Sequence, residues 1–290
     1  DLQESSISLS ASWKEQIRAV ISANIAQLIA NDELAFNDNF DIESFISEAY
    51  IEIRELNGTP FAIIIGKRPI ILGQDIQKMP SYTSNPLLPL QELQEVFGIT
   101  IELTKDPLGI IDHAEFSVYE LIAGDMEIGK LHGKSLRISK YLSDQLLLTL
   151  GASTEGENFS ESNKRINVGL VGVNKSGTLV GWIEGVIFSN DPNYPNSSMA
   201  ITVGTSYEFL PSNYVIAEFN FINKSIMQFG IGLKTVIKEQ FEIGIDARVQ
   251  HLLEEDLTNF FIGLNFTYRF NFSSNSYQEA EEDLLFNEDE

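Results

Sequence analysis

Apolar and polar residues alternate one by one through most of this sequence. In residues 241–250 the odd positions are apolar, while polar or small residues occupy the even positions. The same alternation runs through residues 97–104 and 262–270. A period of two is the signature of a β-strand that has one apolar face and one wet face. The pattern therefore predicts an all-β chain.

Applied along the chain, this criterion predicts fifteen strands, many of them longer than the usual ~5–6 residues. They cover residues 5–14, 16–30, 45–56, 60–71, 95–105, 110–122, 133–142, 145–154, 164–174, 178–189, 198–210, 213–222, 226–237, 241–252 and 258–272. Short helical pieces are expected only in the connections, near residues 41–46 and 88–95.

The predicted connections fall into two kinds that alternate along the chain. Short turns such as Asn57-Gly58-Thr59 and 174–177 (NKSG) have good hairpin chemistry. Longer loops lie between them, for example 31–44 and 72–94, although the connection at 223–225 is short. Short turns on one rim and long loops on the other are the layout of outer-membrane barrels.

A soluble sandwich or soluble barrel would also use strands of period two. However, the wet faces here hold charged residues, glycine, serine, threonine and asparagine, as the wall of a water-filled lumen would. Aromatic residues gather at strand ends, as in the girdles of membrane barrels. We therefore predict a transmembrane antiparallel up-and-down β-barrel over residues 1–272, followed by an acidic C-terminal tail over 273–290.

Strand parity suggests one more strand than the fifteen in the pattern. Bacterial single-chain barrels have even numbers of strands, so we expect sixteen, with a first strand before Asp1 or hidden within a merged stretch, and fourteen as the alternative. The chain starts DLQESS, without a basic start and apolar segment. We interpret this start as the product of signal-peptide removal or of trimming, in a protein of the bacterial outer membrane.

Composition excludes several classes of function. The formal net charge of -23 argues against nucleic-acid binding, because an acidic surface repels phosphates. With no cysteine, the chain has no disulfides and no cysteine-based metal site or nucleophile. The three histidines, His113, His132 and His251, show no metal-ligand spacing. We accordingly predict no catalytic residue, no metal site and no cofactor.

Charged residues on the predicted wet faces are candidates for the lining of a lumen. Lys67 and Arg68 end a strand just before the long loop 72–94, which could fold inward and narrow the channel. The alternative places these two side chains at the lipid-headgroup level, one inside and one outside. The remaining candidates for the lumen or constriction are Arg54, Glu48, Glu52, Glu102, Arg248 and Asp246. Opposed charges would bias ion passage, or would simply pair across strands.

The last predicted strand carries a second recognisable pattern. Gly263 is followed by Phe266, Tyr268 and Phe270 at alternate positions. This stretch resembles the C-terminal assembly signal of outer-membrane proteins, and the resemblance implies that these four residues engage the barrel assembly machinery. Members of that class usually stop at the terminal aromatic residue, whereas this chain continues for 18 residues beyond Phe272.

Residues 48–103 carry a third pattern. They read EAYIEIRELNGTPFAIIIGKRPIILG, then a loop containing NPLLPL, then an acidic stretch that leads into VFGITIEL. This segment resembles the porin-like barrels of the LbtU-type siderophore porin family, with Gly66-Lys67-Arg68-Pro69 in the place of the family's basic pair. Ile71-Leu72-Gly73 replaces the family's next element. The resemblance implies uptake of siderophores or other small solutes.

The sequence thus predicts an outer-membrane channel for passive diffusion of small solutes and no enzyme. The alternative is a non-conducting structural barrel that anchors a partner protein through its loops or its acidic tail. The expected partners are outer-membrane lipid and lipopolysaccharide, small solutes, the barrel assembly machinery and a partner protein at the tail. A solvated tail without a partner is the simpler interpretation of residues 273–290.

Overall fold

The computed structural model describes residues 6–14, 16–24, 46–54, 58–73, 90, 92–103, 110–121, 132–156, 162–191, 194–237 and 241–268. These residues form fifteen strands, which confirms the fifteen segments that the alternation predicts. The strands are β1 (Ser6–Trp13), β2 (Ile17–Asn24), β3 (Ile46–Arg54), β4 (Phe61–Ile71), β5 (Glu92–Leu103), β6 (His113–Leu121), β7 (Gly133–Ser143), β8 (Leu146–Glu155), β9 (Asn163–Val173), β10 (Leu179–Ser189), β11 (Met199–Leu210), β12 (Asn213–Ile222), β13 (Ile226–Ile237), β14 (Phe241–Leu252) and β15 (Leu257–Tyr268).

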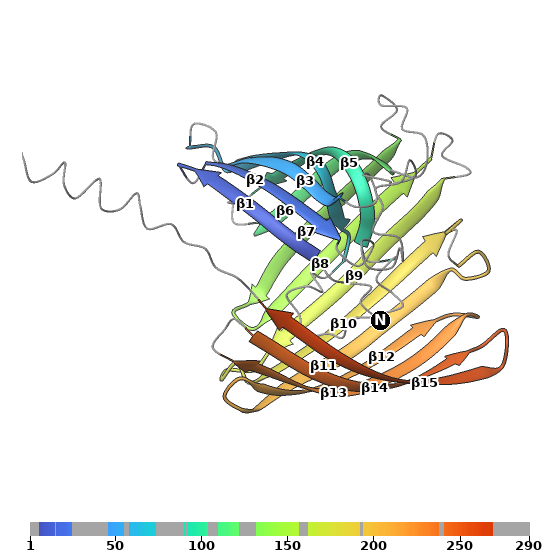
Figure 1. Cartoon of the computed structure of the whole chain (residues 1–290). Helices are drawn as coiled ribbons and strands as arrows, with labels where there is room; N and C mark the ends of the chain where they lie inside the picture. The colour runs from blue at the N-terminus through green and yellow to red at the C-terminus, as the bar shows by residue number, and fades with distance from the viewer. Residues whose placement is uncertain are drawn as a thin grey trace, which may run out of the picture.

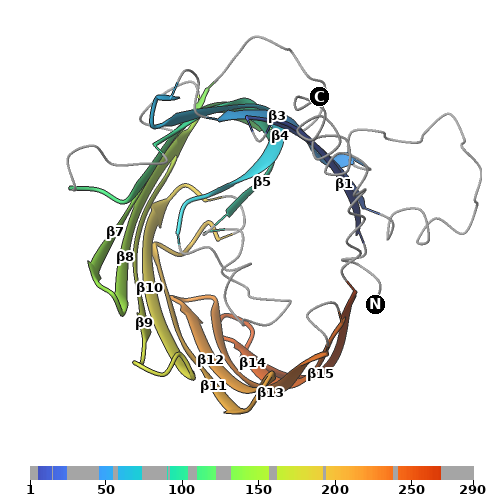
Figure 2. The same cartoon turned by 90° about the vertical axis from the view of Figure 1, so that its left-hand side faces the viewer.

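Each strand pairs antiparallel with the next strand in the sequence, so all fifteen lie in one sheet in chain order. The sheet is tilted and strongly curved (Figure 1). Seen from the side of Figure 2, it bends round a central space, with β3 to β5 facing β12 to β14. This is the antiparallel up-and-down β-barrel fold. Within the described residues, no helix is long and apolar enough to cross a membrane.

The strand register separates an apolar outer face from a polar inner face. One row of directly opposed residues on the outer face runs Ile101, Phe116, Leu136, Ala152 and Ile166. The large side chains in this row are between 44% and 54% exposed. Exposed apolar side chains in such a continuous belt belong against lipid.

The neighbouring row on the inner face is polar. It runs Thr100, Ser117, Ser135 and Ser153, and each of these residues is less than 9% exposed. Thr100 and Ser117 share a hydrogen bond of 2.8 Å between their hydroxyl oxygens. Successive side chains of a strand point to opposite faces, so the alternation in the sequence becomes this division between an apolar outside and a polar inside.

The first and last strands are the two edges of the sheet. Neighbouring antiparallel strands alternate in direction, so β1 and β15, both odd-numbered, run the same way. Within the part of the chain that the structure describes, no pairing joins these two strands. The sixteen strands expected from parity, and fourteen as the alternative, remain a prediction beside the fifteen observed.

Two local features differ from the sequence-based expectation or refine it. The helical piece expected near residues 88–95 is wrong for residues 92–95, which belong to β5. Pairing with β4 explains the extension, since Glu92 and Leu93 lie opposite Ile71 and Ile70. The register of this pair shifts between Arg68 and Ile70. Pro69 lies at the shift, where its missing N–H removes no regular ladder bond.

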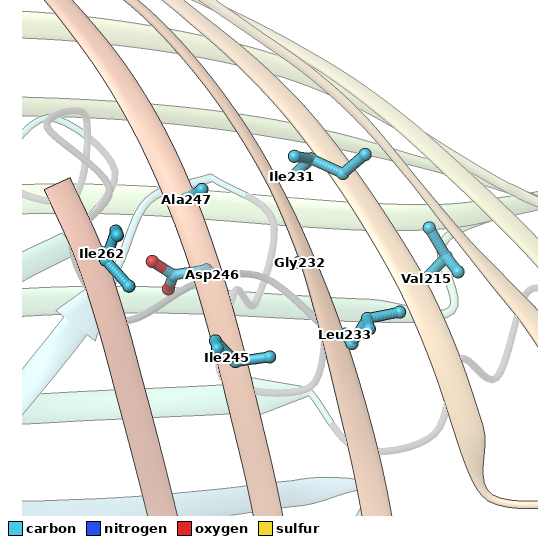
Figure 3. A pocket seen from close by; sticks show the side chains of 8 residues that line it. All are labelled: Val215, Ile231, Gly232, Leu233, Ile245, Asp246, Ala247 and Ile262. Atoms are coloured by element: carbon cyan, nitrogen blue, oxygen red, sulfur yellow. The ribbon is translucent and has the colours of Figure 1, made fainter. Parts of the chain in front are cut away.

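The outer face has a shallow apolar groove over β12 to β15, shown in Figure 3. Its side-chain walls are Val215, Ile231, Leu233, Ile245 and Ile262, with the small Ala247 between them. Gly232 and Asp246 also border it but pair with each other on the opposite face of the sheet. The groove therefore belongs to the lipid-facing belt and does not open into the interior.

Candidate lumen and constriction

A cluster of charged side chains covers the inner face of β3 to β7, and we call it the β3–β7 charge cluster. Its members are Glu52, Arg54, Arg68, Glu102, His113, Glu115 and Arg137. Glu115 is its centre: His113 Nε2 lies 3.4 Å from its Oε1, Arg68 Nη2 lies 3.6 Å from the same oxygen, and Arg137 Nη1 lies 3.8 Å from its Oε2. Two arginines and one histidine thus surround the Glu115 carboxylate.

The same cluster contains a group with the composition of a metal site. Glu102, His113 and Glu115 offer ligand atoms within 4.8 Å of one another. However, His113 uses different nitrogens, since Nδ1 lies 3.4 Å from Glu102 Oε1 while Nε2 faces Glu115. The imidazole therefore bridges two carboxylates, and Arg68 and Arg137 already neutralise one of them. This geometry is that of an ion-pair network within the lumen wall.

The opposite wall has its own pairs on β12 to β14. Arg248 Nη2 lies 2.6 Å from Asp246 Oδ2, and Lys234 Nζ lies 2.5 Å from Glu242 Oε1. Asn220 donates a hydrogen bond of 2.7 Å to Glu218. Figure 2 shows these strands facing β3 to β5 across the interior. Charged walls thus face each other over the central space.

The two ends of the predicted inward loop lie against the inner wall, beginning with Leu72 and Gly73. A Cβ atom on Gly151 would collide with the carbonyl oxygen of Leu72, and one on Gly73 would collide with the carboxylate of Glu184. Arg137 Nε donates a hydrogen bond of 3.0 Å to the carbonyl oxygen of Gly73. The chain that leaves β4 therefore crosses the inner face to reach β8 and β10.

Leu90, at the far end of the same connection, also packs against the inner wall. It is fully buried in an apolar cluster with Val186, Phe188, Ala200 and Ile222 of β10 to β12. Asn167 Nδ2 of β9 lies 3.4 Å from the carbonyl oxygen of Leu90, and it donates a bond of 2.9 Å to Glu184. Both described ends of the connection between β4 and β5 thus occupy space inside the sheet.

A second buried network holds the loop end of β6, β8 and β9. Arg165 Nη2 lies 3.0 Å from Asp191 Oδ2, and Arg165 Nη1 lies 3.7 Å from Glu155 Oε1. Tyr119 and Asn163 both donate to Glu155, over 3.4 and 3.3 Å. All five residues are less than 9% exposed. The sequence patterns above do not single out this network, although alternation with Ile166 and Val168 is a signal that places Arg165 inward.

The predicted lumen residues face inward, with one exception. Glu48 accepts a hydrogen bond of 2.9 Å from Ser22 on the inner face. Lys67 is the exception, because it lies opposite Ala49 and Phe97 on the outer face. The basic pair is therefore divided by the sheet, with Arg68 inside and Lys67 outside. Lys67 is nonetheless only 7% exposed.

The predicted assembly signal lies on β15. Gly263 faces inward opposite Asp246, and Phe266 is 65% exposed on the outer face. Tyr268 ends the strand, paired with Phe241. Phe270, the acidic tail 273–290 and positions 41–45 of the expected helical piece lie outside the described residues, so the roles of the signal and the tail stay predictions.

Comparison with known proteins identifies the fold through structure alone. No family model and no curated sequence matches this chain. A mutant of the porin of Rhodopseudomonas blastica superposes with a TM-score of 0.54 at 12% identity, covering 91% of this chain and 89% of the porin. The outer membrane channel DcaP of Acinetobacter baumannii superposes with a TM-score of 0.57 at 13% identity, covering 91% and 84%. At such identities the likeness shows a shared porin-like barrel fold.

Proposed function

We propose that this chain forms a water-filled channel in the bacterial outer membrane, through which small solutes diffuse passively. One observation carries the proposal: both described ends of the connection between β4 and β5 lie inside a sheet whose inner face is charged and whose outer face is apolar. A lumen lined in this way is wettable. An inward segment reduces its cross-section and brings solutes close to the charged walls. The porin and channel neighbours support this function by their fold.

The balance of inner charges favours cations. The inward acids of the described strands are Glu48, Glu52, Glu102, Glu115, Glu155, Glu184, Glu208, Glu218, Glu242 and Asp246. The inward cations are Arg18, Arg54, Arg68, Arg137, Arg165, Lys234 and Arg248. Acids outnumber bases, so the channel should pass cations more readily than anions.

Siderophore uptake is the finer form of this proposal. It rests on the similarity of residues 48–103 to siderophore porins and needs a lumen wide enough for such a solute. Swelling of liposomes that contain the refolded protein tests the width directly. Graded sugars should enter up to a sharp size limit. Exclusion of every solute of siderophore size would remove this finer form while leaving small-solute diffusion intact.

A non-conducting barrel that anchors a partner is the competing function. The same liposomes decide between the two, because a folded barrel without solute entry would support the structural role. Folding is checked on the same sample by the shift in gel mobility that intact barrels show before boiling.

A further inference from the structure

One histidine lies inside the β3–β7 charge cluster. His113 is the first residue of β6, and it lies directly opposite Ser139 on the inner face of β7. Its Nδ1 lies 3.4 Å from Glu102 Oε1 of β5, and its Nε2 lies 3.4 Å from Glu115 Oε1. Each ring nitrogen therefore faces a different carboxylate.

This bridge between two carboxylates depends on the charge of the imidazole. A neutral ring has one N–H donor and one lone pair, so it can donate to only one of the two carboxylates. A protonated ring donates from both nitrogens. The arrangement of Glu102, His113 and Glu115 therefore favours the protonated ring, because loss of the proton leaves a nitrogen lone pair facing a carboxylate oxygen.

The remaining charges of the cluster balance one another. Its three carboxylates are matched by three guanidinium groups, with Glu52, Glu102 and Glu115 against Arg54, Arg68 and Arg137. The charged neighbours on β2 and β3 are again one base and one acid, because Arg18 lies directly opposite Glu52, and Glu48 accepts a hydrogen bond from Ser22. The cluster is therefore neutral when His113 is neutral, and it carries one net positive charge when His113 is protonated.

The other titratable groups near His113 leave this balance in place. Asp112 and Lys140 lie at the same rim but pair with each other over 3.7 Å, and Lys140 belongs to the outer face of β7. The chain has two further histidines, His132 just before β7 and His251 on β14. Ordinary carboxyl, ammonium and guanidinium groups keep their charge between about pH 5 and pH 8, whereas histidine changes its charge there.

We propose that His113 is the residue through which pH sets the ion selectivity of the lumen. Protonation adds one positive charge to a wall that is otherwise balanced, and this charge repels cations and attracts anions. Deprotonation restores the balance, so the preference for cations returns. This inference rests on the channel proposed above. The change in the charge of His113 can nonetheless be measured in any folded barrel, whether or not it conducts.

Reversal potentials of the refolded full chain in a gradient of potassium chloride, measured from about pH 8 to about pH 5.5, test the proposal. The permeability ratio of potassium to chloride should fall about twofold to threefold, as expected for one unit charge about 7 Å from the ion path in water. His113→Gln should keep the high-pH ratio throughout, and His113→Lys should keep the low-pH ratio throughout. His251→Gln is the matched control and should respond as the wild type does. The His251 side chain is 27% exposed, as that of His113 is, but it lies on the outer face opposite Met227.

A wild-type ratio that stays constant over this pH range would overturn the proposal, and so would a change that persists in His113→Gln or disappears equally in His251→Gln. Unchanged gel mobility before boiling shows that each variant compared is folded. Absence of conductance at every pH would contradict the channel itself.

NMR spectra of the barrel with ¹³C-labelled histidine measure the charge change without the channel. The single histidine variants assign the three ring resonances. The His113 resonance should shift between about pH 8 and about pH 5.5. A His113 resonance that does not shift would overturn the proposal even where the barrel conducts.

Discussion

Arg137 Nε donates a hydrogen bond of 3.0 Å to the carbonyl oxygen of Gly73, although 64 residues separate the two in sequence. The same guanidinium lies 3.8 Å from Glu115 in the β3–β7 charge cluster. One arginine therefore connects the lumen wall to the inward segment. In the proposed channel, this side chain would link the charge of the wall to the position of the segment at Gly73.

Arg137→Gln should consequently widen the channel, because the inward segment loses its bond to β7. We expect a larger single-channel conductance with more fluctuation. Arg248→Gln is the control, since it removes the same inward charge from β14, where Arg248 pairs with Asp246. Equal conductance changes in the two variants would mean that charge alone matters and that the contact with Gly73 does not restrain the segment.

The neighbouring residues Lys67 and Arg68 test which face of β4 lines the lumen. Arg68 faces the lumen and lies 3.6 Å from Glu115, whereas Lys67 faces outward opposite Phe97. Arg68→Gln should move the reversal potential in a salt gradient toward the cation equilibrium value, because a lumen cation is lost. Lys67→Gln should leave it unchanged. A shift produced by Lys67→Gln would contradict the register of β4.

The buried apolar contact of Leu90 with β10 to β12 is the second contact that holds the inward segment against the wall. Leu90→Ala removes a fully buried side chain from Val186, Phe188 and their neighbours, which costs about 2–5 kcal/mol where it is packed. Open-channel noise should increase as the segment leaves the wall. Ile187→Ala is the control, because Ile187 lies on the same strand as Val186 but is 64% exposed to lipid. Open-channel noise of Leu90→Ala equal to that of the wild type would show that the packing of Leu90 is not needed to hold the segment.

Gly263 faces Asp246 and also belongs to the predicted assembly signal, and one substitution tests both. A Cβ atom here would lie 2.7 Å from Asp246 Oδ1, close enough to disturb the pair between Asp246 and Arg248. Gly263→Val should lower the unfolding temperature of the refolded barrel, at a cost of about 1–3 kcal/mol for overpacking. Thermal shifts of gel mobility measure this effect. A stable purified barrel that fails only in cellular assembly would assign Gly263 to the assembly signal alone.

The strands and their faces can be predicted from the sequence because lipid and water impose a period of two. The segments around Ile99, Glu115 and Asp246 are placed correctly on this basis. The shift at Pro69 is not predicted, since a change of register between two strands leaves the alternation within each strand almost intact. Contacts such as Leu90 with Phe188 depend on how a loop crosses the interior. No local periodicity encodes such a crossing.

The buried network of Arg165, Glu155 and Asp191 illustrates the same limit at the loop end. The alternation places Glu155 and Arg165 on the inner face of their strands. It does not show that Glu155 of β8, Arg165 of β9 and Asp191 lie close enough to pair. Tyr194 lies near Asp191 in the connection between β10 and β11. Burial raises the pKa of the Tyr194 phenol, and the negative charge of Asp191 raises it further. Such pairings depend on the folded arrangement of the strands, so the sequence pattern of a single strand does not predict them.

Single-channel recording of the refolded wild-type protein in a planar lipid bilayer tests the central claim most directly. The account predicts discrete conductance steps, with a reversal potential in a salt gradient that indicates a preference for cations. A protein that is folded by its gel mobility, inserts into the bilayer and shows no steps would contradict the channel and favour a structural barrel.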